Sequence, residues 1–279
     1  MLRNILSLLL FSVLISFSCH PQPNARYIHS RGSDTMLILM QRWAEEYMIK
    51  HSDISIYAEG GGSAQGIKAL INGEIDICAS SRTLLPAEVR QLAERHNRLG
   101  IAYLVAKDAL SIYINKNNSV YTLSLNDLKD IFTGRIQNWR ELHGPDLPIR
   151  VISRSPNSGT FLYFKEHVLE DLPYTDRAII KNTTNEVVAA VSNDPGAIGY
   201  GGTAYGDNVR HCRVNNVQPT IENVHNDSYP IIRYLYLYTV DIPEGVIKEF
   251  IDWTLGTEGQ AIVASVGFIP LWDKTQPAD

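Results

Sequence analysis

Four times in this chain an apolar segment typical of a strand runs into a loop rich in glycine, serine or threonine, and a helical pattern follows. The four loops are Arg31-Gly32-Ser33-Asp34-Thr35, Glu59-Gly60-Gly61-Gly62-Ser63, Ser80-Ser81-Arg82 and Arg154-Ser155-Pro156-Asn157-Ser158-Gly159-Thr160. Strands that alternate with helices favour a parallel α/β sheet, and such sheets bind ligands at the carboxyl ends of their strands. The repeat therefore predicts a two-lobed α/β protein whose loops meet in a cleft.

The loop that ends at Thr160 is the most informative of the four. It places Arg154 four residues ahead of Ser158-Gly159-Thr160, which can open a helix. A helix start offers free backbone N–H groups and a positive dipole end, and arginine adds a forked donor suited to phosphate-like oxygens. Taken alone, Ser33-Asp34-Thr35 or Ser158-Gly159-Thr160 is more typical of a plain helix cap. Together they predict one oxyanion held between several helix N-termini.

Signals of other chemistry are weak in this sequence. Gly61–Gly66 has the G-x-x-x-x-G spacing, but Ile67 stands where a nucleotide-binding loop needs lysine. Neither Ser63 nor Ser158 lies in a G-x-S-x-G element, and no carboxylate pair stands out. The eight histidines are scattered without metal-ligand spacing. We therefore expect a binding protein with no catalytic residues, no metal and no cofactor.

The expected elements follow from apolar periodicity. Strands are expected at 27–30, 54–58, 75–79, 149–153, 197–200 and 231–240, with further strands in 101–114, and helices at 36–47, 67–71, 86 onward, 125–132, 161–169, 185–193 and 245–254. Residues 206–228 are polar and expected to be rich in loops. The length of 279 residues allows two modest domains or one large one, and a net charge of -5 argues against a nucleic-acid partner.

The first residues have the pattern of a targeting segment. Arg3 precedes an apolar stretch over 5–17, which is too short for a comfortable membrane span, and Cys19 closes it. This resembles a bacterial lipoprotein signal in which the Ser18–Cys19 bond is cut and Cys19 carries the lipid. The alternative is ordinary secretion with cleavage nearby. Residues 20–26 then form a short tether.

The other two cysteines, Cys78 and Cys212, lie far apart in the sequence and in apolar contexts. An exported protein could join them in a disulfide. Because their spacing resembles no disulfide framework, we expect two buried free thiols.

Taken in order, six segments of this chain resemble the substrate-binding proteins of bacterial phosphate ABC transporters. They are Gly32-Ser33-Asp34-Thr35, Glu59-Gly60-Gly61-Gly62-Ser63, Asp76-Ile77-Cys78-Ala79-Ser80-Ser81-Arg82, Phe132-Thr133-Gly134-Arg135-Ile136-x-Asn138-Trp139, Arg154-x-x-x-Ser158-Gly159-Thr160 and Gly196-Ala197-Ile198-Gly199-Tyr200. The resemblance covers about residues 27–270. It implies a type II periplasmic-binding-protein fold with lobe one at 27–107 plus 226–279, and lobe two inserted at 108–225.

The resemblance also implies the ligand and its donors. Inorganic phosphate would be captured without water between the lobes and delivered to a transporter permease. Carried over position by position, the resemblance implies Thr35, Ser63, Arg154, Ser158, Gly159 and Thr160 as the phosphate donors. Ser33 and Asp34, which lie in the same loop as Thr35, and the pair Ser81 and Arg82 complete the predicted phosphate-binding residues. The protein would act in the periplasm or at the cell surface, anchored to the membrane through Cys19, and as a monomer.

One departure from the family pattern concerns selectivity. Many members have an aspartate after the second strand that accepts the proton of phosphate and so rejects sulfate, whereas this chain has Ser81 followed by Arg82. We expect Arg82 to join Arg154 on the anion. Asp34 is then the candidate proton acceptor, with a plain N-cap as its alternative role.

Other functions remain open at this level. The alternatives are a receptor for another tetrahedral oxyanion such as sulfate, arsenate or molybdate, an exported phosphatase-like enzyme, and a phosphate sensor that docks on a membrane kinase. The sequence does not determine affinity, organism or the choice between transport and sensing.

Overall fold

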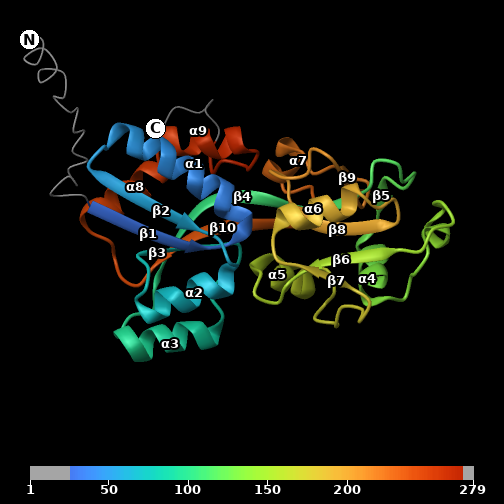
Figure 1. Ribbon diagram of the computed structural model, residues 1–279, viewed down its shortest axis with the longest axis horizontal. Helices are drawn as coiled ribbons and strands as arrows, with labels where there is room; N and C mark the ends of the chain where they lie inside the picture. Colours follow the sequence, from blue (N-terminus) through green and yellow to red (C-terminus); the bar gives the residue numbers. More distant parts are fainter. Residues whose placement is uncertain (1–25, 273–279) are drawn as a thin grey trace, which may run out of the picture.

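The computed structural model describes residues 26–272. The expected signal segment, the lipidation site Cys19 and most of the tether lie outside these residues. Figure 1 shows two groups of elements side by side, with two long strands running between them.

The first group begins with three strand–helix units in succession. These are β1 (Arg26–Gly32), α1 (Asp34–Lys50), β2 (Ile54–Glu59), α2 (Ser63–Asn72), β3 (Ile77–Ser80) and α3 (Pro86–His96). The chain returns to this group at its end with α8 (Gly245–Leu255) and α9 (Thr257–Val266). The apolar stripe predicted for α1 is buried from Met36 to Tyr47, which confirms that helix and its orientation.

The second group is built from shorter elements. They are β5 (Thr122–Leu123), α4 (Leu125–Thr133), the 3-10 turn η1 (Trp139–Leu142), β6 (Arg150–Arg154), α5 (Gly159–His167), β7 (Ile179–Lys181), α6 (Thr184–Ser192), β8 (Ala197–Gly202), β9 (Arg210–Val214) and α7 (Ile221–His225). Two further strands, β4 (Ile101–Ile114) and β10 (Ile232–Thr239), run between the two groups (Figure 1).

All strands except β5 and β9 follow one path, in the order β2-β1-β3-β10-β4-β8-β6-β7. The strands β1, β2 and β3 are parallel, as are β6, β7 and β8. Strand β4 joins the two sets, because its residues up to Ala109 pair with β10 and those from Leu110 onward pair with β8. The fold is thus a two-lobed α/β structure, as expected.

Each lobe has its own apolar core. One cluster packs α1, α8 and α9 on the first half of the sheet, and the other surrounds Phe132, Phe164 and Tyr200. Tyr229 and Ile231 belong to the second cluster although they lie beyond the expected boundary at 226. The return to lobe one therefore runs directly into β10.

Two segments are more regular than the sequence predicted. Residues 206–228, expected to be rich in loops, also contain β9 and α7. In β9 the buried Cys212 and Val214 alternate with Arg213 and His211, and such a short alternation is hidden among polar residues. Residues 101–114 form one continuous strand, because that strand serves both halves of the sheet.

Candidate functional site

Helix starts from the two lobes meet at a pair of threonines. Thr35 lies in the first turn of α1 and Thr160 in the first turn of α5, and their Oγ1 atoms are 3.0 Å apart. Both side chains are buried. The Ser158 hydroxyl caps α5 by accepting from the N–H groups of Thr160 and Phe161. The N-terminal ends of two helices, with their positive dipole ends, thus meet at one place between the lobes.

Glycines allow the lobes to come this close. A Cβ on Gly159 would lie 2.5 Å from the Ser63 hydroxyl and 2.7 Å from that of Ser81. A Cβ on Gly62 would lie 2.7 Å from the Asn157 carbonyl oxygen, and the φ of Gly62 is 95°. The Ala64 N–H also donates across the cleft to Asn157 at 3.2 Å. The glycine-rich loop therefore serves close approach as well as the turn.

Ser63 and Ser81 lie together on the lobe-one side of this contact. Their hydroxyls are 3.3 Å apart, and the Ser81 N–H donates to the Ser63 hydroxyl at 3.2 Å. Both residues have no exposed surface. Two buried hydroxyls at one position can offer a ligand oxygen a donor or a ligand proton an acceptor.

Arg154 bridges the lobes from the end of β6. It donates to a carboxylate oxygen of Asp34 at 2.9 Å, to the Thr184 hydroxyl at 2.9 Å and to the Asn182 carbonyl at 2.8 Å. Its Nε is buried and has no hydrogen-bond partner among the described residues. Burial lowers the pKa of Arg154, and the Asp34 carboxylate opposes that shift. An unpaired buried donor favours a ligand that can accept.

Asp34 occupies the first helical position of α1, and Ser33 stands at the N-cap without a side-chain cap bond. The Asp34 carboxylate instead accepts from Arg154 and from the Gly61 N–H at 3.0 Å. The alternative role of Asp34 as a plain N-cap is therefore not what the structure shows. Each carboxylate oxygen still has a lone pair for another donor.

Arg82 lies at the rim of the site and is largely committed to its own lobe. Its guanidinium forms two hydrogen bonds with Glu88, at 2.7 and 2.8 Å, and one with the Thr83 carbonyl. Only its Nε is buried without a partner. Three of the five N–H donors of Arg82 are therefore already taken, and Nε is the nitrogen left without any partner for an anion.

The sequence analysis missed a third arginine. Arg233 of β10 is 1% exposed, and it forms an ion pair with the fully buried Asp108 of β4 at 2.7 Å. It also donates to Thr160 at 2.7 Å and reaches Thr35 at 3.4 Å. The available signal was a charged residue inside each of two apolar strand patterns, because charges are rarely fully buried unless paired.

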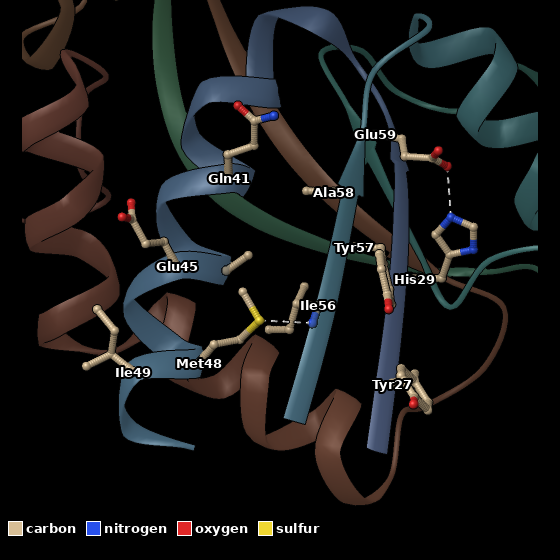
Figure 2. A pocket seen from close by; sticks show the side chains of 11 residues that line it. Tyr27, His29, Gln41, Glu45, Met48, Ile49, Ile56, Tyr57, Ala58 and Glu59 are labelled. Atoms are coloured by element: carbon tan, nitrogen blue, oxygen red, sulfur yellow. Dashed lines mark hydrogen bonds and ion pairs between the residues drawn. The ribbon is translucent and has the colours of Figure 1, made fainter. Parts of the chain in front are cut away.

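Two hollows of the surface help to place the site. A cavity of about 540 Å³ at the cleft edge has Ser81, Arg82 and Arg233 among its lining residues. A larger groove of about 1020 Å³ lies on the outside of lobe one, between α1 and the edge strand β2. Figure 2 shows that groove, where His29 pairs with Glu59 and Tyr27 and Tyr57 lie exposed. The groove contains none of the predicted site residues.

Further observations concern metals, cysteines and membrane spans within residues 26–272. No group of three or more His, Cys, Asp or Glu side chains there has the arrangement of a metal site. Cys78 and Cys212 are both buried and free, as expected. No helix in this range is long and apolar enough to cross a membrane.

Proteins whose two lobes close polar loops over a small solute form the class of periplasmic binding proteins, and the fold places this chain among them. A family model described as the PBP superfamily domain matches residues 19–258. The phosphate-binding protein PstS of Bacillus subtilis is 31% identical over 251 residues, which cover 89% of this chain and 82% of that protein. The chain therefore belongs to the substrate-binding proteins of bacterial phosphate ABC transporters.

Other relatives agree with this assignment. PstS of Borreliella burgdorferi is 27% identical, over 96% of this chain and 99% of that protein. A structure from Clostridium perfringens, described as a phosphate ABC transporter substrate-binding protein with bound phosphate, superposes with a TM-score of 0.82 at 33% identity. It covers 88% of this chain and 100% of that one. These relatives are named as binding proteins and not as enzymes.

Proposed function

We propose that this protein binds inorganic phosphate between its two lobes and delivers it to an ABC-transporter permease. The observation that carries the proposal is the meeting of two helix N-termini, one from each lobe, at Thr35 and Thr160 with Arg154 buried beside them. Backbone N–H groups, hydroxyls and guanidinium donors replace the water shell of the anion.

The ten predicted residues divide into roles within this proposal. Helix starts and hydroxyls come from both lobes, and Arg154 supplies a charged donor through its open Nε. The site would thus contact phosphate with Ser33, Asp34, Thr35, Ser63, Ser81, Arg82, Arg154, Ser158, Gly159 and Thr160. Because donors come from both lobes, phosphate favours the closed arrangement, which a permease can recognise.

Asp34 would select phosphate over sulfate by accepting the proton of HPO₄²⁻. Its carboxylate lies beside Arg154 and has acceptor capacity left. Sulfate carries no proton at neutral pH and gains nothing from such an acceptor. Ser81, which stands where the family often has aspartate, would then act only as a neutral hydroxyl.

The remaining parts of the proposal concern the setting of the protein. The chain is exported, carries a lipid on Cys19 and acts as a monomer in the periplasm or at the cell surface. Lobe one, 27–107 with the residues from β10 onward, would move against lobe two about the crossings at β4 and just before β10. Transport and sensing would use the same ligand site.

Calorimetry tests the proposal on residues 20–279 freed of bound ligand, with phosphate as titrant and sulfate as competitor. Tight one-to-one phosphate binding that sulfate does not affect is the expected result. Equal competition by sulfate would retain an oxyanion receptor but contradict the phosphate assignment. Hydrolysis of a generic phosphomonoester, with or without Zn²⁺ or Mg²⁺, would favour the enzyme alternative.

A further inference from the structure

Arg233 is fixed in place by the strands that cross between the lobes. It stands directly opposite Asp108 in the register of β10 and β4. Its Nε and Nη2 both donate to one carboxylate oxygen, at 2.9 and 2.7 Å, and Asp108 also accepts from the Thr203 N–H at 3.2 Å. The guanidinium therefore has little freedom to turn.

The outer nitrogens of this guanidinium reach one helix start in each lobe. Nη1 donates to the Thr160 hydroxyl at 2.7 Å, and Nη2 lies 3.4 Å from the Thr35 hydroxyl. Thr35 belongs to lobe one and Thr160 to lobe two. A single strand-borne side chain thus contacts both halves of the cleft.

The contact with Arg233 determines how the two threonine hydroxyls can use their protons. Arginine can only donate, so it occupies an acceptor position on each threonine oxygen. The two hydroxyls share one hydrogen bond, which uses one of their two protons. The other proton has no acceptor among the hydrogen bonds of the described residues that involve Thr35 and Thr160. It is left for an oxygen that accepts.

We infer that Arg233 is a positioning residue for the anion, which acts through Thr160 and Thr35 by holding their hydroxyls as donors in the closed cleft. The inference rests on the proposed function for the identity of the ligand. Because Asp108 neutralises Arg233, the effect depends on hydrogen-bond geometry rather than on net charge. Arg233 is then, beside Arg154, an arginine on which ligand affinity depends although it was not among the predicted site residues.

A double-mutant cycle on phosphate affinity tests this inference by calorimetry. The paired change R233M with D108N avoids a buried unpaired carboxylate, and we expect it to weaken binding about tenfold or more. In a T160V background the same pair of changes is expected to cost clearly less, because the nearer of the two partner hydroxyls is already gone and only the longer contact with Thr35 is left. R98M, which removes an exposed ion pair with Asp241, serves as the control and leaves affinity unchanged.

R233K gives a second route if the paired change fails to fold. Lysine retains the charge but lacks the fork, so it cannot hold Asp108 and both threonines together. We expect about a tenfold loss that is also clearly smaller in the T160V background. Unfolding of the ligand-free variants, followed by circular dichroism, shows that they are folded.

Two results would overturn the inference: unchanged affinity in both Arg233 variants, or a loss that persists in full when Thr160 is valine. The second would mean that Arg233 acts independently of the hydroxyl. If wild type binds sulfate and not phosphate, the proposed function fails, but the same cycle run with sulfate still decides the role of Arg233. If wild type binds neither anion, both proposals fall.

Discussion

Arg82 and Arg233 both line the cleft edge, but their surroundings differ. Arg82 pairs with Glu88, six residues along the chain, and both belong to lobe one. Arg233 pairs with Asp108, 125 residues away, and contacts a helix start from each lobe. Proximity to a ligand site therefore does not give an arginine its role, because that role depends on which of its N–H donors are already taken.

The largest effect on phosphate affinity is expected where Gly159 of lobe two meets Ser63 and Ser81 of lobe one. In G159A the new methyl group would overlap the hydroxyls of Ser63 and Ser81, so closure is blocked. We expect phosphate affinity to fall about a hundredfold or more, measured by calorimetry. The ligand-free protein can open to avoid the overlap, so its melting temperature should change little. Near-normal affinity in G159A would mean that the lobes need not approach this closely.

R82M tests whether Arg82 mainly stabilises lobe one through its pairing with Glu88. It removes a largely buried ion pair with Glu88, so we expect a loss of about 1–3 kcal/mol in the free energy of unfolding, measured with urea. Phosphate affinity should fall less than about tenfold, because most of the N–H donors of Arg82 are already taken within lobe one. E88Q is the matched control, since it retains the shape of the partner.

A hundredfold loss of affinity in R82M, with E88Q near wild type, would contradict this division of roles. Arg82 would then turn from Glu88 to the anion, as the sequence analysis expected. Arg82 and Arg233 would in that case act together, and the contrast between them would disappear.

D34N tests which group accepts the proton of phosphate. Asparagine retains an oxygen for Arg154 but presents an N–H₂ group in place of the second carboxylate oxygen. We expect phosphate binding to weaken about tenfold while sulfate binding is unchanged or improved. Calorimetric titrations with each anion give the ratio, and E59Q at the end of β2 is the control. An unchanged ratio would rule out Asp34 as the selective acceptor.

The smallest expected effect concerns His211, which lies on lobe two against β4. Its Nδ1 is 2.8 Å from the Ser111 hydroxyl, and burial lowers the pKa of the imidazole. The unfolded chain binds a proton more readily, so stability is full above about pH 6.5 and falls on acidification. Between pH 7 and pH 5 the wild type should lose more free energy of unfolding than H211N does, by less than about 1 kcal/mol. Urea unfolding at the two pH values measures this difference. Parallel pH profiles would contradict this role of His211.

The sequence was informative wherever neighbouring residues act together. The loop from Arg154 to Thr160 contains its own helix cap, and the buried stripe of α1 follows from apolar spacing alone. For the same reason the family and the helix-start donors could be predicted. The pairing of Arg82 with Glu88 was missed although it is local, because Arg82 was expected to join Arg154 on the anion.

By itself the sequence determined the two-lobed α/β class, the family and the loops that open the helices, because periodicity and capping are local properties of the chain. Only the tertiary structure decided which donors remain free. Arg233 and Asp108 are distant in sequence and look like isolated charges in apolar strands, and they become a site feature when β10 pairs with β4. The contact of Thr35 with Thr160 depends in turn on lobe closure. The acceptor that each hydrogen-bond donor meets is set by contacts between residues distant in sequence, and the spacing of residues along the chain does not show those contacts.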